Sequence, residues 1–304
     1  DLLPTTYFHV VFTLPDSLSP LTLRNQKVVY HILFKAASET LKTLTQDPKH
    51  LGAEVGFIAV LHTWSQTLMD HPHLHCIVTG GGLSPDGTQW IPCKEDFLVH
   101  VKALSRLFRG KFLAYLSEAR QKGKLNFPGK IDHMRQDKSF NALLSDLYQK
   151  DWVVYCKRPF TNAEAVMDYL GRYTHRVAIS NDRVVNMEGN RVTFRYRDRN
   201  DNDTVKYLTL DAEEFIRRFL MHVLPDGFMK IRHYGILSNR SRRTKLVVAK
   251  TLLGVNDPDF STEVKETWQD LLTRITGRDP RICPHCGKGR MVLKEVLRPS
   301  ALSP

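Results

Sequence analysis

Short strand-like runs separated by turns constrain the fold of this chain more than any other feature of its sequence. The first run, Tyr7 to Leu14, is rich in β-branched and aromatic residues and is bounded by Pro4 and Pro15. Further runs of this kind are predicted at 55–64, 74–79, 152–156, 176–180, 183–187, 191–197 and 204–210. Several are joined by turns too short for the crossover that parallel strands need, so the pattern predicts an α+β fold with antiparallel strand pairs.

Helical patterns are interleaved with these strands. Apolar residues recur at helical spacing from Pro20 to about Thr45, and Thr161 with Glu164 forms a capping box that opens a helix through about Arg172. Further helices are predicted at 97–118, 140–149, 211–223 and from 241 onward. The segment 70–72 is predicted to be a turn, and the glycine run 80–82 with residues 84–87 a flexible loop.

The charge balance favours a polyanionic partner. The chain has 44 Lys and Arg residues against 32 Asp and Glu, a formal net charge of +12, and cations gain affinity by releasing counterions from phosphates. Five cysteines, odd in number and mostly isolated, argue against a secreted disulfide scaffold and predict a reducing cytoplasm. No apolar run approaches the roughly 20 residues that cross a bilayer, so no membrane association is expected.

His73-Leu74-His75 places two imidazoles at alternate positions of a predicted strand, so both point to the same face. Their Cα atoms are about 6.7 Å apart at the strand rise, and the rings can converge on one ion. His71 continues the alternation but starts about 13 Å from His75, so any third ligand should come from another element. Imidazole favours borderline divalent ions, although Mg²⁺ or Mn²⁺ can occupy a site completed by oxygens. A purely structural histidine pair is the alternative.

Tyr169 and Tyr173 lie four positions apart on a predicted helix and are neighbours on one face of it. A tyrosine can act as a covalent nucleophile when a metal polarises the electrophile and a nearby cation favours the phenolate. Arg172 and Arg176 have the same spacing on an adjacent face. Attack on a phosphodiester would give a phosphotyrosine and conserve the bond energy for rejoining. Core packing of the two rings is the alternative, but the segment is unusually polar.

These motifs occur in a fixed order along residues 5–245: YFHVVFTLP (7–15), HPHLHCIV (71–78) with its glycine run, WVVYCKRPF (152–160), YLGRYTHRVAISN (169–181) and IRHYG (231–235). Together they resemble the rolling-circle insertion-sequence transposases of the HUH endonuclease superfamily, in its two-tyrosine class. The resemblance implies a ferredoxin-like or RRM-like antiparallel sheet that carries the histidines, with the tyrosine helix beside the metal. It also implies a 5′-phosphotyrosine intermediate, a free 3′-OH and transposition through single strands.

The resemblance makes His73 and His75 metal ligands and Tyr169 and Tyr173 the catalytic tyrosines. The third metal ligand matches no motif, and the candidates are His9, Asp70 and His175. Which tyrosine attacks first does not follow from their spacing.

A basic segment follows the motifs. Between Arg217 and Lys250 there are nine Lys or Arg residues and one acidic residue, Asp226. Cations can track a phosphate backbone while aromatic rings stack on unpaired bases. The predicted DNA-binding residues are Lys157, Arg158, Arg172, Arg176, Arg232, Tyr234, Arg240, Arg242 and Arg243. A weaker patch at 191–199 is diluted by Asp198, Asp201 and Asp203.

Three regions are predicted: a nuclease core at 1–185, a strand-rich and basic DNA-contacting extension at 186–254, and a helical tail at 255–304. Transposases of this class usually begin with a cysteine-rich zinc-binding module, and this sequence starts just after the point where such a module would end. In the tail, Cys283 and Cys286 form half of a zinc knuckle. A structural Zn²⁺ normally takes four ligands, so the remaining ligands would have to come from elsewhere.

The sequence therefore predicts a metal-dependent DNA transposase that cleaves and rejoins single-stranded DNA at transposon ends and targets. It is expected in the bacterial cytoplasm, associated with the nucleoid, with Mg²⁺ or Mn²⁺ as its ion. The alternatives are a rolling-circle replication initiator or relaxase, a non-catalytic DNA-binding relative, and a metal-dependent hydrolase that uses water. The oligomeric state and the DNA sequences recognised do not follow from the sequence.

Overall fold

The computed structural model describes residues 3–94, 97–160, 178–198, 201–255, 269–270, 273, 277, 279–283 and 285–291. The chain divides into two compact units, residues 1–255 and 256–304. The strands are β1 (Tyr7–Thr13), β2 (Glu54–Trp64), β3 (Asp70–Leu83), β4 (Trp90–Pro92), β5 (Val154–Phe160), β6 (Val184–Glu188), β7 (Arg191–Asp198), β8 (Thr204–Asp211) and β9 (Ile231–Gly235). The α-helices are α1 (Ser19–Arg24), α2 (Gln26–Gln46), α3 (Val101–Gln121), α4 (Asp137–Gln149), α6 (Ala212–Leu220) and α7 (Lys245–Leu252). Short 3-10 helices are η1 (Asp16–Leu18), η2 (Gly129–Arg135) and η3 (Asn181–Arg183).

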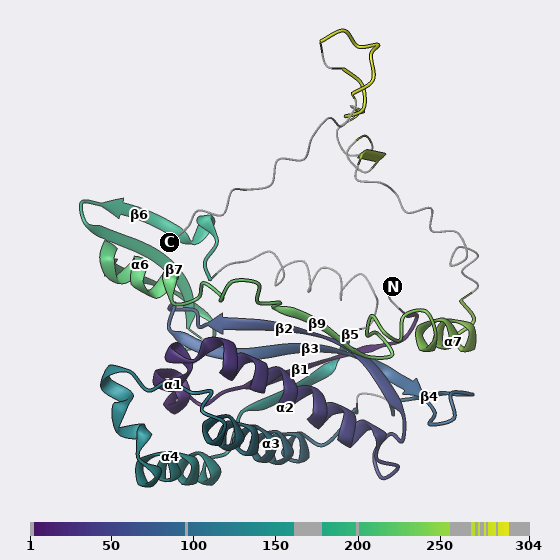
Figure 1. Cartoon of the computed structure of the whole chain (residues 1–304), viewed down its shortest axis with the longest axis horizontal. Coiled ribbons are helices and arrows are strands. Elements are labelled where there is room, and N and C mark those ends of the chain that lie inside the picture. Colours follow the sequence, from purple (N-terminus) through teal and green to yellow (C-terminus); the bar gives the residue numbers. More distant parts are fainter. Residues whose placement is uncertain are drawn as a thin grey trace. The chain divides into compact units, whose positions relative to one another are not determined.

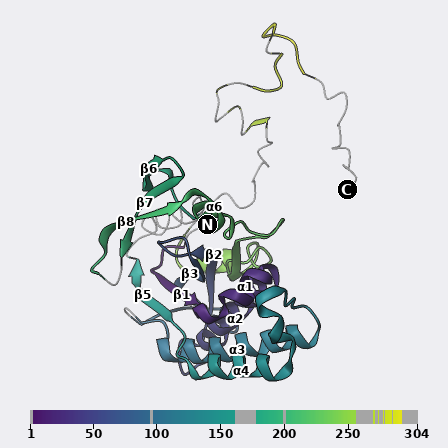
Figure 2. The same ribbon diagram turned by 90° about the vertical axis from the view of Figure 1, so that its left-hand side faces the viewer.

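The main sheet has the strand order β5-β1-β3-β2-β9, with β4 paired to β3, and each of its pairings is antiparallel. Helices α1 to α4 gather on one side of this sheet, and the small sheet β6-β7-β8 with α6 lies on the other (Figure 2). The small sheet lies at one end of the main sheet and α7 at the other (Figure 1). This arrangement confirms the predicted α+β fold with an antiparallel sheet.

Alternation along the strands gives the main sheet two different faces. Phe8, Val10 and Phe12 of β1 belong to one apolar core with Leu74 and Cys76 of β3 and with the buried faces of α2 and α3. Residues between them point the other way, because successive side chains of a strand alternate. Histidines occupy that second face, so the helices cover one side of the sheet and leave the histidine side to other parts of the chain.

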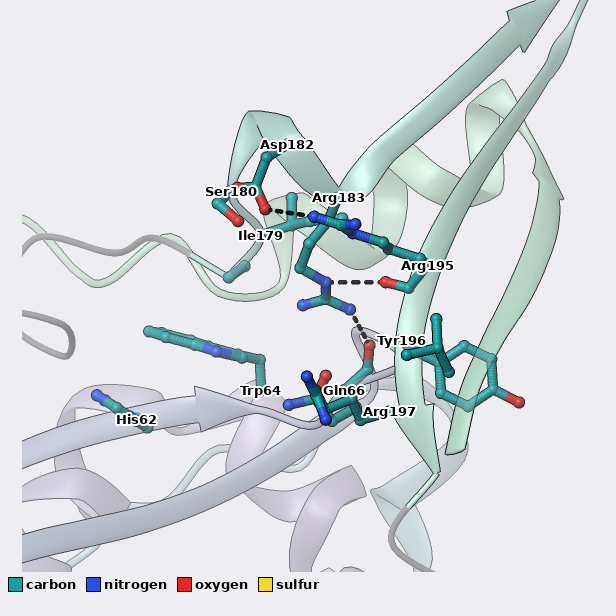
Figure 3. A pocket seen from close by; sticks show the side chains of 12 residues that line it. His62, Trp64, Gln66, Ile179, Ser180, Asp182, Arg183, Arg195, Tyr196 and Arg197 are labelled. Atoms are coloured by element: carbon teal, nitrogen blue, oxygen red, sulfur yellow. Dashed lines mark hydrogen bonds and ion pairs between the residues drawn. The ribbon is translucent and has the colours of Figure 1, made fainter. Parts of the chain in front are cut away.

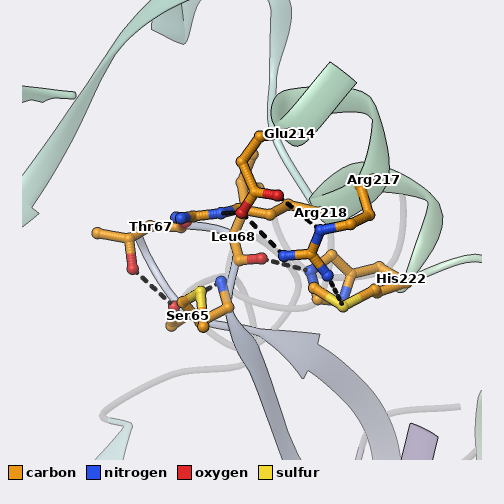
Figure 4. Close-up of polar contacts among 9 residues, drawn as sticks. Ser65, Thr67, Leu68, Glu214, Arg217, Arg218 and His222 are labelled. Atoms are coloured by element: carbon orange, nitrogen blue, oxygen red, sulfur yellow. Dashed lines mark hydrogen bonds and ion pairs between the residues drawn. The ribbon is translucent and has the colours of Figure 1, made fainter. Parts of the chain in front are cut away.

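The small sheet is fastened to the turn between β2 and β3. Its apolar face packs Phe194 against Leu68 of this turn. Arg218 of α6 donates a hydrogen bond to the Thr67 carbonyl at 3.1 Å, and His222 Nε2 donates to the Leu68 carbonyl at 3.1 Å (Figure 4). Burial lowers the pKa of His222, because its protonated form would lose hydration. The turn therefore sets the position of the small sheet relative to the end of β2.

Two predicted connections fall wholly or partly within β3. The segment 70–72 begins this strand and the glycine run 80–82 continues it, so the predicted turn at 70–72 is wrong. The loop predicted over 80–82 and 84–87 is wrong in its first part, while residues 84–87 do form a connection between β3 and β4. The turn lies at 65–69, where Leu68 has a φ of 62°. The glycines are needed for close approach: a Cβ at Gly82 would lie 2.5 Å from the Glu54 carbonyl oxygen, and one at Gly80 would lie 2.8 Å from the Thr6 carbonyl oxygen.

Other boundaries also move. Residues 178–180, the described part of the predicted strand at 176–180, are irregular and lead into η3. The helix predicted from 241 onward starts at Lys245. Strand β9, which belongs to the predicted extension at 186–254, pairs with β2 of the main sheet. In the part of the chain that the structure describes, no helix combines the length and the apolar character that a membrane span requires.

The close approach of β2 and β3 predicts that Gly82→Ala destabilises the fold. Overpacking against the Glu54 backbone should lower the free energy of unfolding by about 1–3 kcal/mol. Gly110→Ala is the matched control, because it lies inside α3 with nothing within 4 Å of the added Cβ, and it should raise the free energy of unfolding by up to about 1 kcal/mol. Urea unfolding of the three proteins measures both changes. Equal midpoints for Gly82→Ala and the parent chain would contradict this account of the glycine run.

Candidate metal centre and DNA-contacting residues

Three histidines from adjacent strands converge on the face of the main sheet opposite to helices α1 to α4. His62 of β2 stands directly opposite His73 of β3, and His75 lies two positions along the same strand face. One ligand nitrogen from each ring lies within 4.8 Å of the others. The cluster is a consequence of register, because antiparallel partners share a face and lie close together.

Hydrogen bonds assign the ring nitrogens that face a ligand. His73 Nδ1 lies 2.7 Å from the His71 carbonyl oxygen, which can only accept, so Nδ1 carries the proton and Nε2 offers its lone pair. His75 Nδ1 lies 2.9 Å from Nε2 of His9, and the two rings stack with centroids 5.1 Å apart. When His75 Nδ1 carries the proton and donates it to His9, His75 Nε2 offers its lone pair and is the nitrogen that can ligate. His9 therefore orients His75 in the way that outer partners orient metal-bound imidazoles.

The donor set fits a divalent transition-type ion. Three neutral imidazoles are the ligands that such ions prefer, and three protein ligands leave positions for water or substrate oxygens. His62 and His75 are buried, whereas His73 is partly exposed. Solvent therefore contacts the cluster through His73. Three histidines on one sheet face are thus able to hold a divalent ion.

Sequence reasoning found His73 and His75 but missed His62. His73-Leu74-His75 is visible within a single strand, whereas His62 joins it only through the pairing of β2 with β3. The available signal was weak: His62 continues the alternation of Ile58 and Val60 in a run already predicted as a strand. The third histidine of the cluster thus comes from β2, and no local sequence pattern reveals how β2 is aligned with β3.

The three candidates for the third ligand take other places. His9 lies on the histidine face but contacts His75 from behind. Asp70 is buried and shares its strand face with Leu74, so it lies on the helical side. Burial raises the pKa of Tyr30 of α2, and the charge of Asp70 adds to that rise. Burial raises the pKa of Asp70 to about 6, opposed by the Ser19 hydroxyl and assisted by the charge of Asp16. His175 lies outside the described residues.

The predicted catalytic tyrosines lie outside the described residues. These are Tyr169 and Tyr173, together with the predicted DNA-binding residues Arg172 and Arg176. Lys157 of β5 stands opposite His9 in the sheet register, next to Arg158. Strand β5, which precedes the tyrosine segment in the chain, is thereby an edge strand beside β1.

The basic segment is divided between the two faces of the sheet. Arg232 and Tyr234 of β9 are on the helical face: the Arg232 guanidinium lies 4.0 Å from the centre of the Phe34 ring, and Tyr234 stacks on Phe57 with centroids 4.9 Å apart. His233 between them is on the other face, since it pairs with Ile58. Both predicted DNA-binding residues therefore pack against the core, away from the histidine cluster.

Three arginines that follow β9 are exposed. Arg240, Arg242 and Arg243 lie between β9 and α7. Burial, with the positive charge of Arg242 nearby, lowers the pKa of His233. This loop is accessible to a polyanion.

The knuckle at the C-terminal end forms a small hairpin within the second unit. Ile282 pairs with Arg290, and the Gly289 amide donates a hydrogen bond to Cys286 Sγ at 3.3 Å. Backbone amides at this turn lower the pKa of the Cys286 thiol, which favours the thiolate that metals bind. Among the described residues, however, no third potential ligand joins Cys283 and Cys286.

Comparison with known proteins gives the family. A family model described as "Putative transposase" (Y2_Tnp) matches residues 56–245, more than half of the chain. The chain belongs to this transposase family. The match begins in β2 and ends at the start of α7, so it includes the histidine cluster and the small sheet. The family predicted from the sequence motifs is confirmed.

Curated relatives of this transposase carry the same description. "Putative transposase y4qJ" of Sinorhizobium fredii is 50% identical over 297 residues, which are 97% of this chain and 75% of the relative. The "Transposase for insertion sequence element IS801" of Pseudomonas savastanoi pv. phaseolicola is 30% identical over 233 residues, which are 76% of this chain and 54% of the relative.

Among solved structures, the conjugative relaxase TrwC in complex with mutant OriT DNA aligns with 80% of this chain and 72% of its own, at a TM-score of 0.29 and 15% identity. The metal-bound TrwC complex aligns with 83% of this chain and 73% of its own, at a TM-score of 0.30 and 13% identity. Scores this low do not establish a shared fold.

The geometry predicts that a ligand histidine and the supporting His9 contribute differently to metal affinity. His62→Ala removes a ligand and should abolish measurable Mn²⁺ binding, whereas His9→Ala only frees the His75 ring and should weaken binding by about 10- to 100-fold. His133→Ala, on the exposed surface, is the matched control and should bind as the parent chain does. Isothermal titration with Mn²⁺ measures all three. Parent-like binding by His62→Ala would contradict the three-histidine site.

The raised pKa of Asp70 predicts a pH-dependent gain from Asp70→Asn. A carboxyl whose folded pKa lies above its unfolded value stabilises the fold below the unfolded pKa and loses that contribution as the pH rises through the folded pKa, here about 6. Asp70→Asn should therefore raise the free energy of unfolding by about 2–3 kcal/mol near pH 8, and by little near pH 4. Urea unfolding at both pH values measures the difference. A loss of stability in Asp70→Asn near pH 8 would show that the ionised carboxylate is stabilising.

Proposed function

We propose that this transposase cleaves and rejoins single-stranded DNA through a tyrosine-linked intermediate, at a divalent ion held by His62, His73 and His75. One observation carries the proposal: three imidazoles converge on one face of an antiparallel sheet, in a chain of a transposase family. DNA is the substrate of transposition, and the net charge of +12 suits a polyanion.

The chain's own groups divide the work. Held by the three imidazoles, Mg²⁺ or Mn²⁺ would supply Lewis-acid stabilisation of the charge that develops on the scissile phosphate. His9 keeps the His75 ring in its ligating tautomer. The His71 carbonyl does the same for His73. Preorganisation of this kind places the phosphate at one point on the sheet face.

The covalent step uses a tyrosine of the segment at 169–173. The phenol oxygen of Tyr169 or Tyr173 attacks phosphorus and loses its proton to solvent, the bond from phosphorus to the 3′-oxygen breaks, and that oxygen takes up a proton to leave as a 3′-OH. The product is a 5′-phosphotyrosine. The reverse reaction, with the 3′-OH of another strand as the nucleophile, rejoins the DNA without an external energy source. Two tyrosines allow two such events in one round of transposition.

DNA contacts are proposed on the segments that flank this centre. Lys157 and Arg158 belong to β5, the edge strand beside β1, and precede the tyrosine segment in the chain, so they suit the scissile strand. The exposed loop with Arg240, Arg242 and Arg243 suits a neighbouring part of the backbone. In this scheme residues 1–185 perform the chemistry and residues 186–254 contact DNA at transposon ends and target, in the nucleoid of the bacterial cytoplasm.

Covalent trapping tests the proposal. With Mn²⁺ and single-stranded oligonucleotides that carry the element's ends, the parent chain should give a protein–DNA adduct whose mass maps to Tyr169 or Tyr173. Tyr169→Phe with Tyr173→Phe should lower cleavage by at least about 100-fold, the scale of a lost nucleophile. Tyr148→Phe, at an exposed position of α4, is the matched control and should cleave normally.

The other outcomes separate the rival functions. Cleavage that survives in the double variant would indicate a hydrolase with water as the nucleophile. Binding without cleavage by the parent chain would indicate a non-catalytic DNA-binding protein. Cleavage at a replication or transfer origin, with none at transposon ends, would indicate an initiator or relaxase.

A further inference from the structure

A cavity of about 480 Å³ lies between the end of β2 and the small sheet, on the histidine side of the main sheet. Figure 3 shows Trp64 and Gln66 on one wall with Arg197 beside Gln66, and Arg183 and Arg195 on the other side with Asp182. His62 lines the cavity and also belongs to the metal cluster. The cavity is therefore continuous with the place where the scissile phosphate is proposed to bind, and its volume suits one small molecule or one unit of a polymer.

One wall is an aromatic platform. The Trp64 ring stacks on His62 with centroids 4.7 Å apart and planes inclined by 18°. This pair extends the histidine cluster by a large flat ring that is only partly buried. A nucleobase stacks on such a ring whatever its identity, because each base has a π-face.

Arginines of β7 make the cavity cationic. Along β7, alternate residues Val192 and Phe194 face the apolar side, while Arg195 and Arg197 are exposed and line the cavity. Arg195 also forms an ion pair with Asp182 at 3.0 Å. Arginine guanidinium groups are well suited to phosphate oxygens.

Acidic residues near these arginines are held elsewhere. Asp198 and Asp201 bind Lys206 at 2.8 and 2.9 Å. Lys206 pairs with Tyr196, on the strand face opposite to that of Arg197. The positive and negative charges of the patch at 191–199 are thus separated in space. Among the described residues that line the cavity, Asp182 is the acidic one, beside the three arginines.

We propose that this cavity binds one unpaired nucleotide of single-stranded DNA next to the scissile phosphate, with its base stacked on Trp64 and its phosphates held by Arg195 and Arg197. The inference rests on the proposed function, since it takes single-stranded DNA as the substrate. Stacking on Trp64 needs a base that is free of its own neighbour, so duplex DNA does not fit. The small sheet acts as a clamp that fixes the strand at the metal centre.

Binding measured without divalent ions isolates the cavity from the chemistry. Fluorescence anisotropy of labelled oligo(dT) in EDTA, on chains carrying Tyr169→Phe and Tyr173→Phe, reports affinity alone. Trp64→Ala should weaken binding by about 5- to 100-fold, the range for loss of one stacked base, and Trp64→Phe should restore most of it. Arg197→Gln should weaken binding and lower the slope of log affinity against log salt by about one.

A matched control is available on the same strand. Arg191→Gln removes the same charge from an exposed position of β7 that does not line the cavity, and it should bind more like the parent chain than Arg197→Gln does. Oligonucleotides with 5-iodouracil give a positive readout, because light should crosslink the stacked base to the peptide that contains Trp64. Thermal melts establish that each variant is folded. If Trp64→Ala does not fold, the affinity of Arg197→Gln and the position of the crosslink test the cavity proposal.

Two results would overturn the cavity proposal: parent-like affinity of folded Trp64→Ala and Arg197→Gln, or crosslinks that map away from β2 and the small sheet. Equal affinity for duplex and single-stranded DNA would also reject it. These outcomes are independent of the proposed nuclease. If Trp64 governs binding but no tyrosine adduct forms in the parent chain with Mn²⁺, the nuclease proposal fails and the cavity stands. If the parent chain forms the adduct normally but Trp64→Ala binds DNA as tightly as the parent, the cavity proposal fails and the nuclease proposal stands.

Discussion

The antiparallel pairing of β2 with β3 is the constraint on which the rest of the structure depends. It sets His62 opposite His73 and so completes a cluster that neither strand could form alone. It needs close backbone contact, which the glycines of β3 permit because a Cβ at Gly82 would meet the Glu54 backbone. A slip of one residue would turn every histidine of β3 toward the helices, because side chains alternate along a strand.

The same hairpin positions the small sheet. Its turn accepts hydrogen bonds from Arg218 and His222 and packs under Phe194. The strand that carries His62 thus ends at the point where the small sheet is fixed, and a cavity lined by Trp64 and arginines lies beside the cluster. Metal centre and proposed nucleotide site are two consequences of one strand pairing.

Sequence patterns predicted most of the elements, the paired histidines and the family, because each depends on residues close together in the chain or on several ordered motifs. They failed where distant segments meet. The glycine run was expected to be a loop, but packing against β2 and the N-terminal segment makes it a strand. Strand alternation in β9 likewise directs Arg232 and Tyr234, predicted as DNA-binding residues, toward Phe34 and Phe57, which no local pattern indicated.

By itself, the sequence determined the α+β class, the shared face of His73 and His75, the tyrosine pair at helical spacing and the transposase family. These follow from local periodicity and from the order of motifs. Only the tertiary structure decided that His62 is the third imidazole, that His9 supports His75, and that Arg195 and Arg197 face a cavity while Asp198 and Asp201 bind Lys206. Each of these depends on the register and docking of strands, which long-range packing sets and no short window of residues encodes.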